Sequence, residues 1–222
     1  MLLGEAVMIN WSDVEPTHRH DYYHWHSREH MVGRVSLSGF CRGRRYVAVD
    51  ARRDFLILYE VQNVGVLAGE EYLTKANAPS ELTRRTAPFV KNAIRGLARV
   101  HASYGIGSGA MTMTLRFSSA PGGEESVASY LADVALPRLA EQAEIAGAHY
   151  LVVDRKVSSI VPVERQGRPT AIPDRIVVVE AVETQALDDA RRSLLSDEQL
   201  TKHGAAAPIE QDIYRLQIMV TK

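Results

Sequence analysis

The chain has 222 residues, 45% of them hydrophobic, so it can bury a core as one large domain or as two domains of about 100 residues each. Its 26 basic and 27 acidic residues give a net charge of −1, which argues against a dedicated nucleic-acid-binding protein. Because it has a single cysteine, Cys41, no signal-peptide pattern and no apolar run of the ~18 residues that a membrane helix needs, we expect a cytoplasmic protein without disulfides or membrane partners.

The first half of the chain shows the patterns of strands and amphipathic helices in a regular order. In chain order, the predicted elements are a strand at 6–11, a helix at 14–35, strands at 40–49 and 55–61, helices at 70–75 and 80–94, and a strand at 97–104. Asp13 and Ser80 are the expected N-caps of the first and third helices. Pro88 must interrupt the third helix, because proline lacks the amide hydrogen that a helix interior uses.

The second half repeats this order with fewer elements. Its predicted elements are a strand at 111–117, a helix at 124–146, strands at 150–157 and 176–182, a helix at 186–195 and a strand at 213–220. Gly147 is expected to end the long helix at the position after its C-cap, and Pro137 to kink it.

Local matches between the halves indicate an internal duplication. Trp11-Ser12 resembles Phe117-Ser118 at an offset of 106 residues, and the run that starts at Asp54 resembles the run at Asp174 at an offset of 120. The offset changes where about a dozen extra residues, 162–173, form a loop insertion. A constant order of elements with slowly drifting offsets is typical of duplicated modules.

These patterns predict an α+β protein made of two tandem ferredoxin-like βαββαβ halves, residues 1–106 and 107–222. Each half would form an antiparallel sheet with helices on one face only. The two bare faces can pack against each other and close an α+β barrel. Because the strand faces mix polar and apolar residues, we expect the barrel interior to be lined for a ligand.

One stretch of the sequence is similar to a known family. Trp25-His26-Ser27-Arg28-Glu29-His30-Met31-Val32-Gly33-Arg34-Val35, followed by Gly39-Phe40 and Arg44-Arg45-Tyr46, resembles the first helix and second strand of dimeric α+β barrel proteins of the EthD-like type. The similarity covers residues 5 to 61. His26 stands where tyrosine is more usual in that family, and the second half has no comparable helix, so a pocket is expected in the first half.

The resemblance implies a superfamily rather than one reaction. That superfamily contains cofactor-free monooxygenases, lactone isomerases, polyketide cyclases, haem enzymes and many proteins of unassigned role. A shared fold alone does not choose among these activities.

The histidine-rich segment supplies the candidate catalytic residues. Five of the eight histidines lie between His18 and His30, and His26, His30 and Arg34 follow one another at four-residue spacing on one helix face. A histidine there could move a proton while Arg34 holds an anionic or enolate oxygen. The alternative is that the histidines are exposed, or are hydrogen-bonded wall residues, and that Arg34 forms an ion pair on the surface.

The predicted substrate-binding residues are Tyr22, on the same helix face, and Arg45 and Glu60, on neighbouring strands. Glu60 and Glu180 occupy matching positions in the two halves, so we expect both to face the same side of the barrel. His26 to His30 also fits the H-x-x-E-H motif of a zinc peptidase, but no downstream residue stands out as a third ligand. We therefore expect no metal and no cofactor.

Two functions remain open at this stage. The first is a small-molecule enzyme with cofactor-independent acid–base chemistry, an isomerase, cyclase or lyase acting on an aromatic or polyketide-like compound. The second is a non-catalytic ligand-binding or accessory barrel that partners a catabolic enzyme. A homodimer is possible in either case. It is not required to close the barrel, because the duplication already supplies a partner for each sheet.

Overall fold

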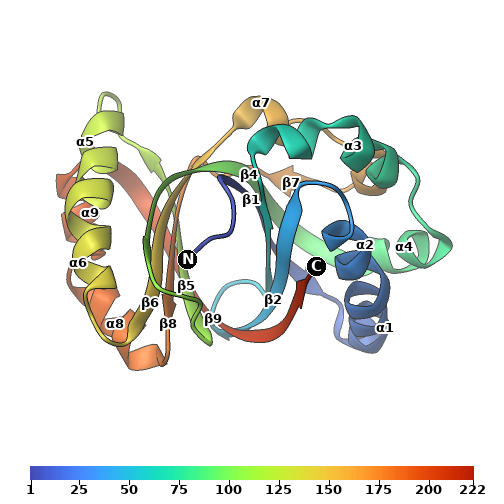
Figure 1. Ribbon diagram of the computed structural model, residues 1–222, viewed down its shortest axis with the longest axis horizontal. Helices are drawn as coiled ribbons and strands as arrows, with labels where there is room; N and C mark the ends of the chain where they lie inside the picture. Colours follow the sequence, from blue (N-terminus) through green and yellow to red (C-terminus); the bar gives the residue numbers. More distant parts are fainter.

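Eight antiparallel strands form a closed barrel in the computed structural model, which describes all 222 residues (Figure 1). The strands are β1 (Ala6–Val14), β2 (Phe40–Asp50), β3 (Phe55–Val61), β4 (Val90–Gly105), β5 (Met111–Ser119), β6 (Ile145–Val153), β8 (Arg175–Ala181) and β9 (Ala205–Thr221). They follow one another in the order β1-β3-β2-β9-β5-β8-β6-β4, and β4 pairs again with β1. The two-residue strand β7 (Thr170–Ala171) adds to β4 in parallel. The predicted α+β barrel fold is confirmed.

The two halves of the chain have the same strand order. In the first half the order is β4-β1-β3-β2, and in the second half it is β9-β5-β8-β6, which is the ferredoxin-like arrangement in both. Pairing of β2 with β9 and of β4 with β6 joins the halves into one sheet. One chain therefore supplies every strand of the barrel. The division into domains at residues 106 and 107 stays a prediction.

The helices lie outside the barrel in two groups, one at each end of the molecule (Figure 1). The first group contains α1 (Arg19–Trp25), the π-helical segment η2 (His26–His30), α2 (Met31–Val35), α3 (Glu70–Asn77) and α4 (Glu81–Thr86), with the 3₁₀ turns η1 (Pro16–His18), η3 (Val64–Ala68) and η4 (Ala87–Phe89). The second group contains α5 (Glu124–Ser129), the π-helical segment η5 (Tyr130–Ala135), α6 (Leu136–Ala140), α8 (Thr184–Arg192) and α9 (Asp197–Lys202). A long connection before β8 carries α7 (Arg155–Ser158) and the 3₁₀ turn η6 (Val163–Arg165). None of these helices has the length and apolar character needed to cross a membrane.

Several predicted boundaries are wrong because long-range strand pairing extends the strands. β1 continues to Val14, which pairs with β4, so Asp13 caps no helix and instead accepts a hydrogen bond from the backbone N–H of Asp54 (2.9 Å). The long helix of the second half ends at Ala140, and Gly147 lies within β6. Ser80 does cap α4, since its side chain accepts a hydrogen bond from the backbone N–H of Thr83 (3.0 Å).

The barrel interior is filled by side chains, so the expected ligand-lined interior is wrong. A cluster of 13 buried apolar residues occupies it, including Trp11 and Tyr214. Beside this cluster, Arg44 forms ion pairs with both Glu60 (2.8 Å) and Glu180. The two matching glutamates therefore face the same side of the sheet, as predicted, but that side is a packed core. Any ligand site has to lie elsewhere.

Candidate functional site

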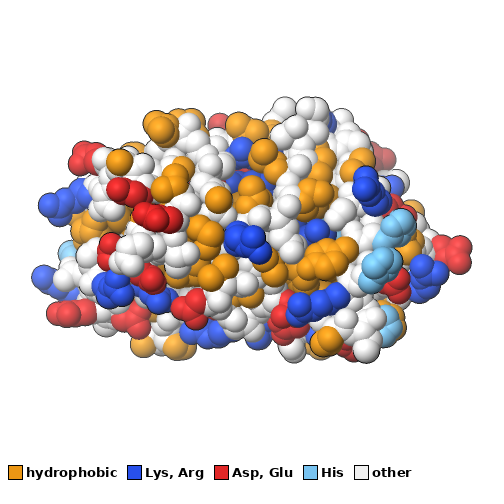
Figure 2. Space-filling view, turned by 90° about the horizontal axis from the view of Figure 1, so that it is seen from below, with side chains coloured by type: hydrophobic (Ala, Val, Ile, Leu, Met, Phe, Trp, Pro, Cys, Tyr) orange, Lys and Arg blue, Asp and Glu red, His pale blue; other side chains and the backbone are white.

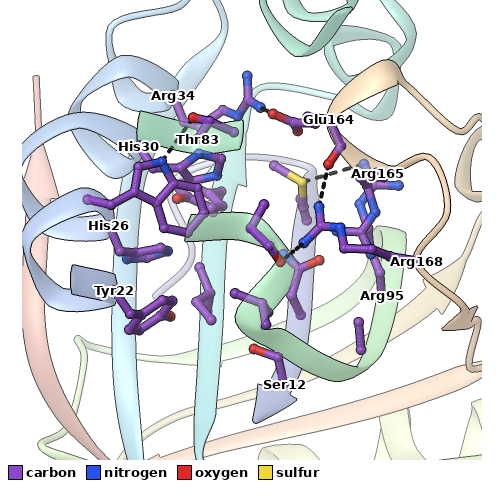
Figure 3. A pocket seen from close by; sticks show the side chains of 18 of the residues that line it. Ser12, Tyr22, His26, His30, Arg34, Thr83, Arg95, Glu164, Arg165 and Arg168 are labelled. Carbon is purple, nitrogen blue, oxygen red and sulfur yellow. Dashed lines mark hydrogen bonds and ion pairs between the residues drawn. The ribbon is translucent and has the colours of Figure 1, made fainter. Parts of the chain in front are cut away.

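The first helix forms one wall of a pocket on the outer face of the barrel. Tyr22, His26, His30 and Arg34 point from α1, η2 and α2 into this pocket (Figure 3). Trp25 holds the helix in place, because its indole N–H donates a hydrogen bond to Thr83 Oγ1 of α4 (2.9 Å). The four-residue spacing noted in the sequence thus corresponds to one face of a helix that is anchored on both the sheet and α4.

The pocket is a cavity of about 70 Å³ between the helices and the outer face of the sheet. Its other walls are parts of β1, β3 and β4, the helices α3 and α4, and the loop after α7. Besides the four residues of the first helix, the lining consists of Met8, Asn10, Trp11, Ser12, Trp25, Ile57, Tyr59, Tyr72, Thr83, Ala87, Val90, Ala93, Arg95, Glu164, Arg165 and Arg168. Both halves of the chain therefore contribute to a pocket that sits on the first half.

Arg45 fixes the protonation of His26. The Arg45 guanidinium, which has only donors, lies 3.3 Å from His26 Nδ1 and also donates to Ser27 Oγ (3.0 Å). His26 Nδ1 must then be an acceptor, so the proton of the neutral ring is on Nε2. Burial first, and then the charge of Arg45, lower the pKa of His26 well below its ordinary value. His26 is therefore neutral at physiological pH and suited to donate a hydrogen bond from Nε2.

His30 lies one turn further along and is free to exchange a proton. Neither of its ring nitrogens has a hydrogen-bond partner within the protein, and its ring packs 4.6 Å from the centroid of the Trp25 ring. Burial first, and then the charge of Arg34 and the proximity of His26, lower the pKa of His30 well below the ordinary value. The ring is thus in its neutral form, with one nitrogen available as a base.

Arg34 is buried (2% exposed) and forms an ion pair with Glu164 of the loop after α7. This pair is buried, whereas the alternative interpretation expected an ion pair of Arg34 on the surface. The pair involves Nη2 of the guanidinium, whereas the other arm of the guanidinium, Nη1, is buried without a hydrogen-bond partner. The hydroxyls of Tyr22 and Tyr59 are also buried and unpartnered. Buried polar groups are nearly always hydrogen-bonded, so these three donors are available to a polar ligand.

The structure does not bring all six predicted site residues together. Tyr22, His26, His30 and Arg34 line the cavity, whereas Arg45 lies behind His26 and does not reach the cavity wall. Glu60 lies on the opposite face of the sheet, fully buried in the barrel, where it pairs with Arg42 and Arg44. Strand alternation explains this separation, since Tyr59 faces the cavity and its neighbour must face the interior.

Three cavity residues were missed by sequence reasoning. Arg95 falls between the predicted helix 80–94 and the predicted strand 97–104, and Arg165 and Arg168 fall in the predicted loop insertion 162–173. Figure 3 shows these arginines on the side of the pocket opposite His26 and His30. The insertion at 162–173, which breaks the internal repeat, is a sequence signal that could have pointed to Arg165 and Arg168, whereas no such signal marks Arg95 of β4.

The remaining histidines of the segment are not part of the site. His20 and His24 are exposed, and His18 stacks on Phe89 with ring centroids 3.4 Å apart. Seen from below, histidine side chains gather at the end of the molecule that carries α1 (Figure 2). This agrees with the alternative interpretation of the sequence, in which these three histidines have no catalytic role.

The H-x-x-E-H motif does not assemble a metal site. Glu29 faces α4, where its carboxylate accepts hydrogen bonds from Ser80 and from Thr83 Oγ1 (3.3 Å). The structure contains no group of three or more histidine, cysteine, aspartate or glutamate side chains that could hold a metal ion. A zinc peptidase needs a third protein ligand, and this geometry offers none.

Comparisons of the whole chain show the fold. An anthrone oxidase-like protein matches with a TM-score of 0.65 and 14% identity over 97% of this chain and 92% of that one. A protein from Fusobacterium nucleatum described as a "putative monooxygenase" matches with a TM-score of 0.64 and 8% identity over 100% and 96%. A heme-binding protein from Thermus thermophilus matches with a TM-score of 0.55 and 10% identity over 97% and 92%. The chain has the dimeric α+β barrel fold, as the resemblance implied.

Comparisons of the sequence add nothing further. No protein-family model matches the chain, and no curated protein is similar to it. The identities to these three solved structures, between 8% and 14%, show a shared fold alone.

The residues present do not fit a haem, although one of these structures binds it. A haem would need open space around the histidine nitrogen that holds its iron. The space beside His30 is about 70 Å³, below the ~300 Å³ at the lower end of ordinary ligand sites. His30 also lacks the hydrogen-bond partner that usually orients an axial histidine. The corresponding face of the second half is a packed cluster of 24 buried apolar residues.

Proposed function

We propose that the protein is a small-molecule enzyme that moves a proton on an aromatic or polyketide-like ketone without a cofactor. The observation that carries this proposal is the convergence of a neutral, unpartnered His30 and the unpaired arm of Arg34 on one cavity. A base and a fixed cation on one wall are what enolisation requires. The resulting reaction class is that of an isomerase, cyclase or lyase.

The proton balance of this step is simple. A nitrogen of His30 accepts the proton from a carbon conjugated with the carbonyl group, either next to it or, as in anthrone, across the ring, and the electron pair of that C–H bond moves through the conjugated system to form an enolate. The free arm of Arg34 would donate a hydrogen bond to the enolate oxygen, and the hydroxyls of Tyr22 and Tyr59 are further donors in the cavity wall. Burial raises the pKa of both tyrosines, so they stay protonated as donors. Return of the proton to a different carbon gives the isomer.

The lowered pKa of His30 is compatible with this role. Protonating His30 alone would add a cation beside Arg34, which is unfavourable. When the ligand becomes an enolate in the same step, the net charge of the pocket does not change. The developing anion then stabilises the imidazolium, because opposite charges in a poorly solvated site interact strongly.

The cavity by itself holds only the reactive end of such a molecule. An open groove of about 700 Å³ adjoins it, lined by α4, η4 and the loop that carries Glu164 and Arg168, and both of these residues also line the cavity. The rest of a multi-ring ligand would lie in that groove.

Deuterium exchange tests the proposal without knowledge of the natural product. Anthrone is a suitable probe, since a structural neighbour is anthrone oxidase-like and the C10 methylene protons of anthrone are acidic. We expect the protein to accelerate exchange of these protons in deuterated buffer, followed by mass spectrometry. His30→Asn should reduce the acceleration by about a hundredfold or more, while the exposed variant His20→Asn should leave it unchanged.

Anthrone binding without accelerated exchange would contradict the enzymatic proposal. It would favour the second function, a ligand-binding or accessory barrel.

A further inference from the structure

Four guanidinium groups face the cavity, but only one carboxylate does. Arg34 and Arg95 are buried, at 2% and 3% exposed, and Arg165 and Arg168 are half-buried. Glu164 is the one acidic residue of the cavity wall, and its carboxylate pairs with Arg34. Three arginines of this pocket therefore have no ion-pair partner.

The hydrogen bonds of these three arginines all go to neutral groups. Arg95 donates to Tyr72 Oη (2.9 Å), Arg165 donates to Thr170 Oγ1 (2.9 Å), and Arg168 donates to the carbonyl oxygens of Ala87 (3.3 Å) and Glu164. Arg95 is buried and the other two arginines are half-buried, and cations removed from water without a counter-charge are costly. Burial first, and then the charges of Arg95 and Arg168, lower the pKa of Arg165 to about 9. A bound anion would reverse this penalty.

We infer that the ligand of this pocket is an aromatic carboxylate, with its carboxylate oxygens among Arg95, Arg165 and Arg168 and its aromatic body toward His30. Guanidinium groups form paired hydrogen bonds with carboxylates. Apolar side chains, among them Ile57, Val90 and Ala93, line the same pocket. This inference rests on the proposed function and adds the class of substrate to it.

The arrangement assigns different roles to the two halves of the chain. The first helix supplies the groups that move the proton, and the 162–173 insertion of the second half supplies two of the three cations that would select the ligand. Arg165 and Arg168 are then substrate-binding residues.

Titration with small probes tests the charge preference. We expect benzoate to bind the protein at least tenfold more tightly than benzamide, its neutral counterpart, in isothermal titration calorimetry. Its affinity should fall as the salt concentration rises. Equal binding of benzoate and benzamide would overturn the inference. Inorganic phosphate binding as tightly as benzoate would also overturn it, because the site would then recognise charge alone.

Two substitutions in the loop should act in opposite directions. Arg168→Gln should weaken benzoate binding about tenfold, whereas Glu164→Gln, which removes the only competing carboxylate and frees Arg34, should strengthen it. Arg155→Gln is the matched control, since Arg155 lies in the same connection but is exposed and pairs with Asp174. Circular dichroism of each variant checks that the fold is retained. Benzoate affinity unchanged in both Arg168→Gln and Arg165→Gln would overturn the inference.

His30→Asn separates this inference from the proposed function. The variant should keep benzoate binding and lose anthrone exchange. If wild-type protein binds benzoate through the loop arginines but never accelerates exchange, the proposed function fails and the carboxylate site stands. If exchange depends on His30 but benzoate does not bind, the carboxylate inference fails and the proposed function stands.

Discussion

Burial changes the chemistry of three histidines in this protein. Free histidine titrates near pH 6.5, where a charged imidazole is well solvated. His26 and His30 lie against the cavity and His149 lies inside the barrel, and burial is the first cause of a lowered pKa for each. A lowered pKa has a thermodynamic consequence, since the unfolded chain then binds protons that the folded chain does not.

This difference predicts an acid-sensitive fold. Below pH 6.5 the unfolded state takes up protons at these three histidines, so the free energy of unfolding should fall as the pH is lowered from 6.5 to 5. Each histidine contributes at most about 1.4 kcal/mol per pH unit. Above pH 6.5 their contribution is constant. Urea unfolding at a series of pH values measures the slope.

Substitution of the two pocket histidines should reduce that slope. The double variant His26→Asn/His30→Asn removes two of the three proton-binding differences, so its stability should depend less on pH between 6.5 and 5. His20→Asn removes an imidazole whose side chain is 97% exposed and should leave the slope unchanged. An equal slope in wild type and the double variant would contradict the prediction.

The sequence allowed part of the site to be predicted, and geometry explains which part. Residues of one helix face share a pattern that depends only on local periodicity, so Tyr22, His26, His30 and Arg34 were found together. Glu60 was misplaced because the sequence does not show which face of a strand meets the helices and which meets the barrel interior. Arg165 and Arg168 reach the cavity because the fold brings the insertion 162–173 against the first half of the chain. Local sequence periodicity does not show that contact.

At the scale of elements, the π-helical segments reflect the duplication. η2 interrupts the first helix between α1 and α2, and η5 interrupts the corresponding helix between α5 and α6. π-helical turns often occur at functional sites. Here the second copy is surrounded by apolar core, including the buried residues Leu131 and Ala135. The π turn is therefore a feature of both modules, and the histidines are what distinguishes the first.

Element boundaries were predictable where local signals act alone. The strand 55–61 was predicted with its observed bounds. The helix predicted at 80–94 is interrupted before Pro88 as expected, since α4 ends at Thr86, but its last part is wrong, because β4 begins at Val90. The helix predicted to continue to Ala146 ends early because Ile145–Val153 pairs with both β4 and β8, which overrides its helical pattern. α9 was missed although Ser196 caps it and Gln199 follows three residues later, a combination typical of a capping box.

The loop after α7 is the element that closes the pocket. It is held to the first half by the Arg34–Glu164 ion pair, by Arg168 and by a hydrogen bond from the backbone N–H of Val163 to Asn77 Oδ1 (2.9 Å). Replacing residues 163–168 with a short Gly-Ser linker should lower benzoate affinity at least tenfold, because two cations and one wall of the cavity are lost. Calorimetry measures the affinity.

The barrel itself should tolerate this replacement. Since 163–168 contributes no strand to the eight-stranded sheet, the thermal unfolding midpoint should fall by only a few degrees. Unchanged benzoate affinity in the shortened protein would show that the loop does not form the site.

At the scale of the whole molecule, Arg44 connects the two halves inside the barrel. It pairs with Glu60 of the first half and with Glu180 of the second, and all three side chains are fully buried. Burial opposes the ionised form of Glu180, but the neighbouring His149 and the charge of Arg44 lower the pKa of Glu180 to about 2. The carboxylate is therefore charged at all pH values at which the protein is expected to fold.

Removing this charge should destabilise the entire barrel. Glu180→Gln leaves Arg44 with one carboxylate in a site without solvent, and we expect a loss of about 3 kcal/mol in the free energy of unfolding. Glu141→Gln, at an exposed position on the second half, should change it by less than about 0.5 kcal/mol. Urea unfolding by circular dichroism measures both. Equal stability of the two variants would mean that the pair does not contribute to joining the halves.

The closed sheet also predicts how the separate halves behave. A fragment of residues 1–106 would expose the edges of β2 and β4, which pair with β9 and β6 in the intact chain, together with the inner face of its sheet. Unpaired edges and an uncovered apolar face favour association. We expect each fragment, 1–106 and 107–222, to be unfolded or self-associated when alone, and a mixture of the two to form a one-to-one complex with a single unfolding transition. Sedimentation and circular dichroism test this, and a monomeric fragment that unfolds cooperatively would contradict it.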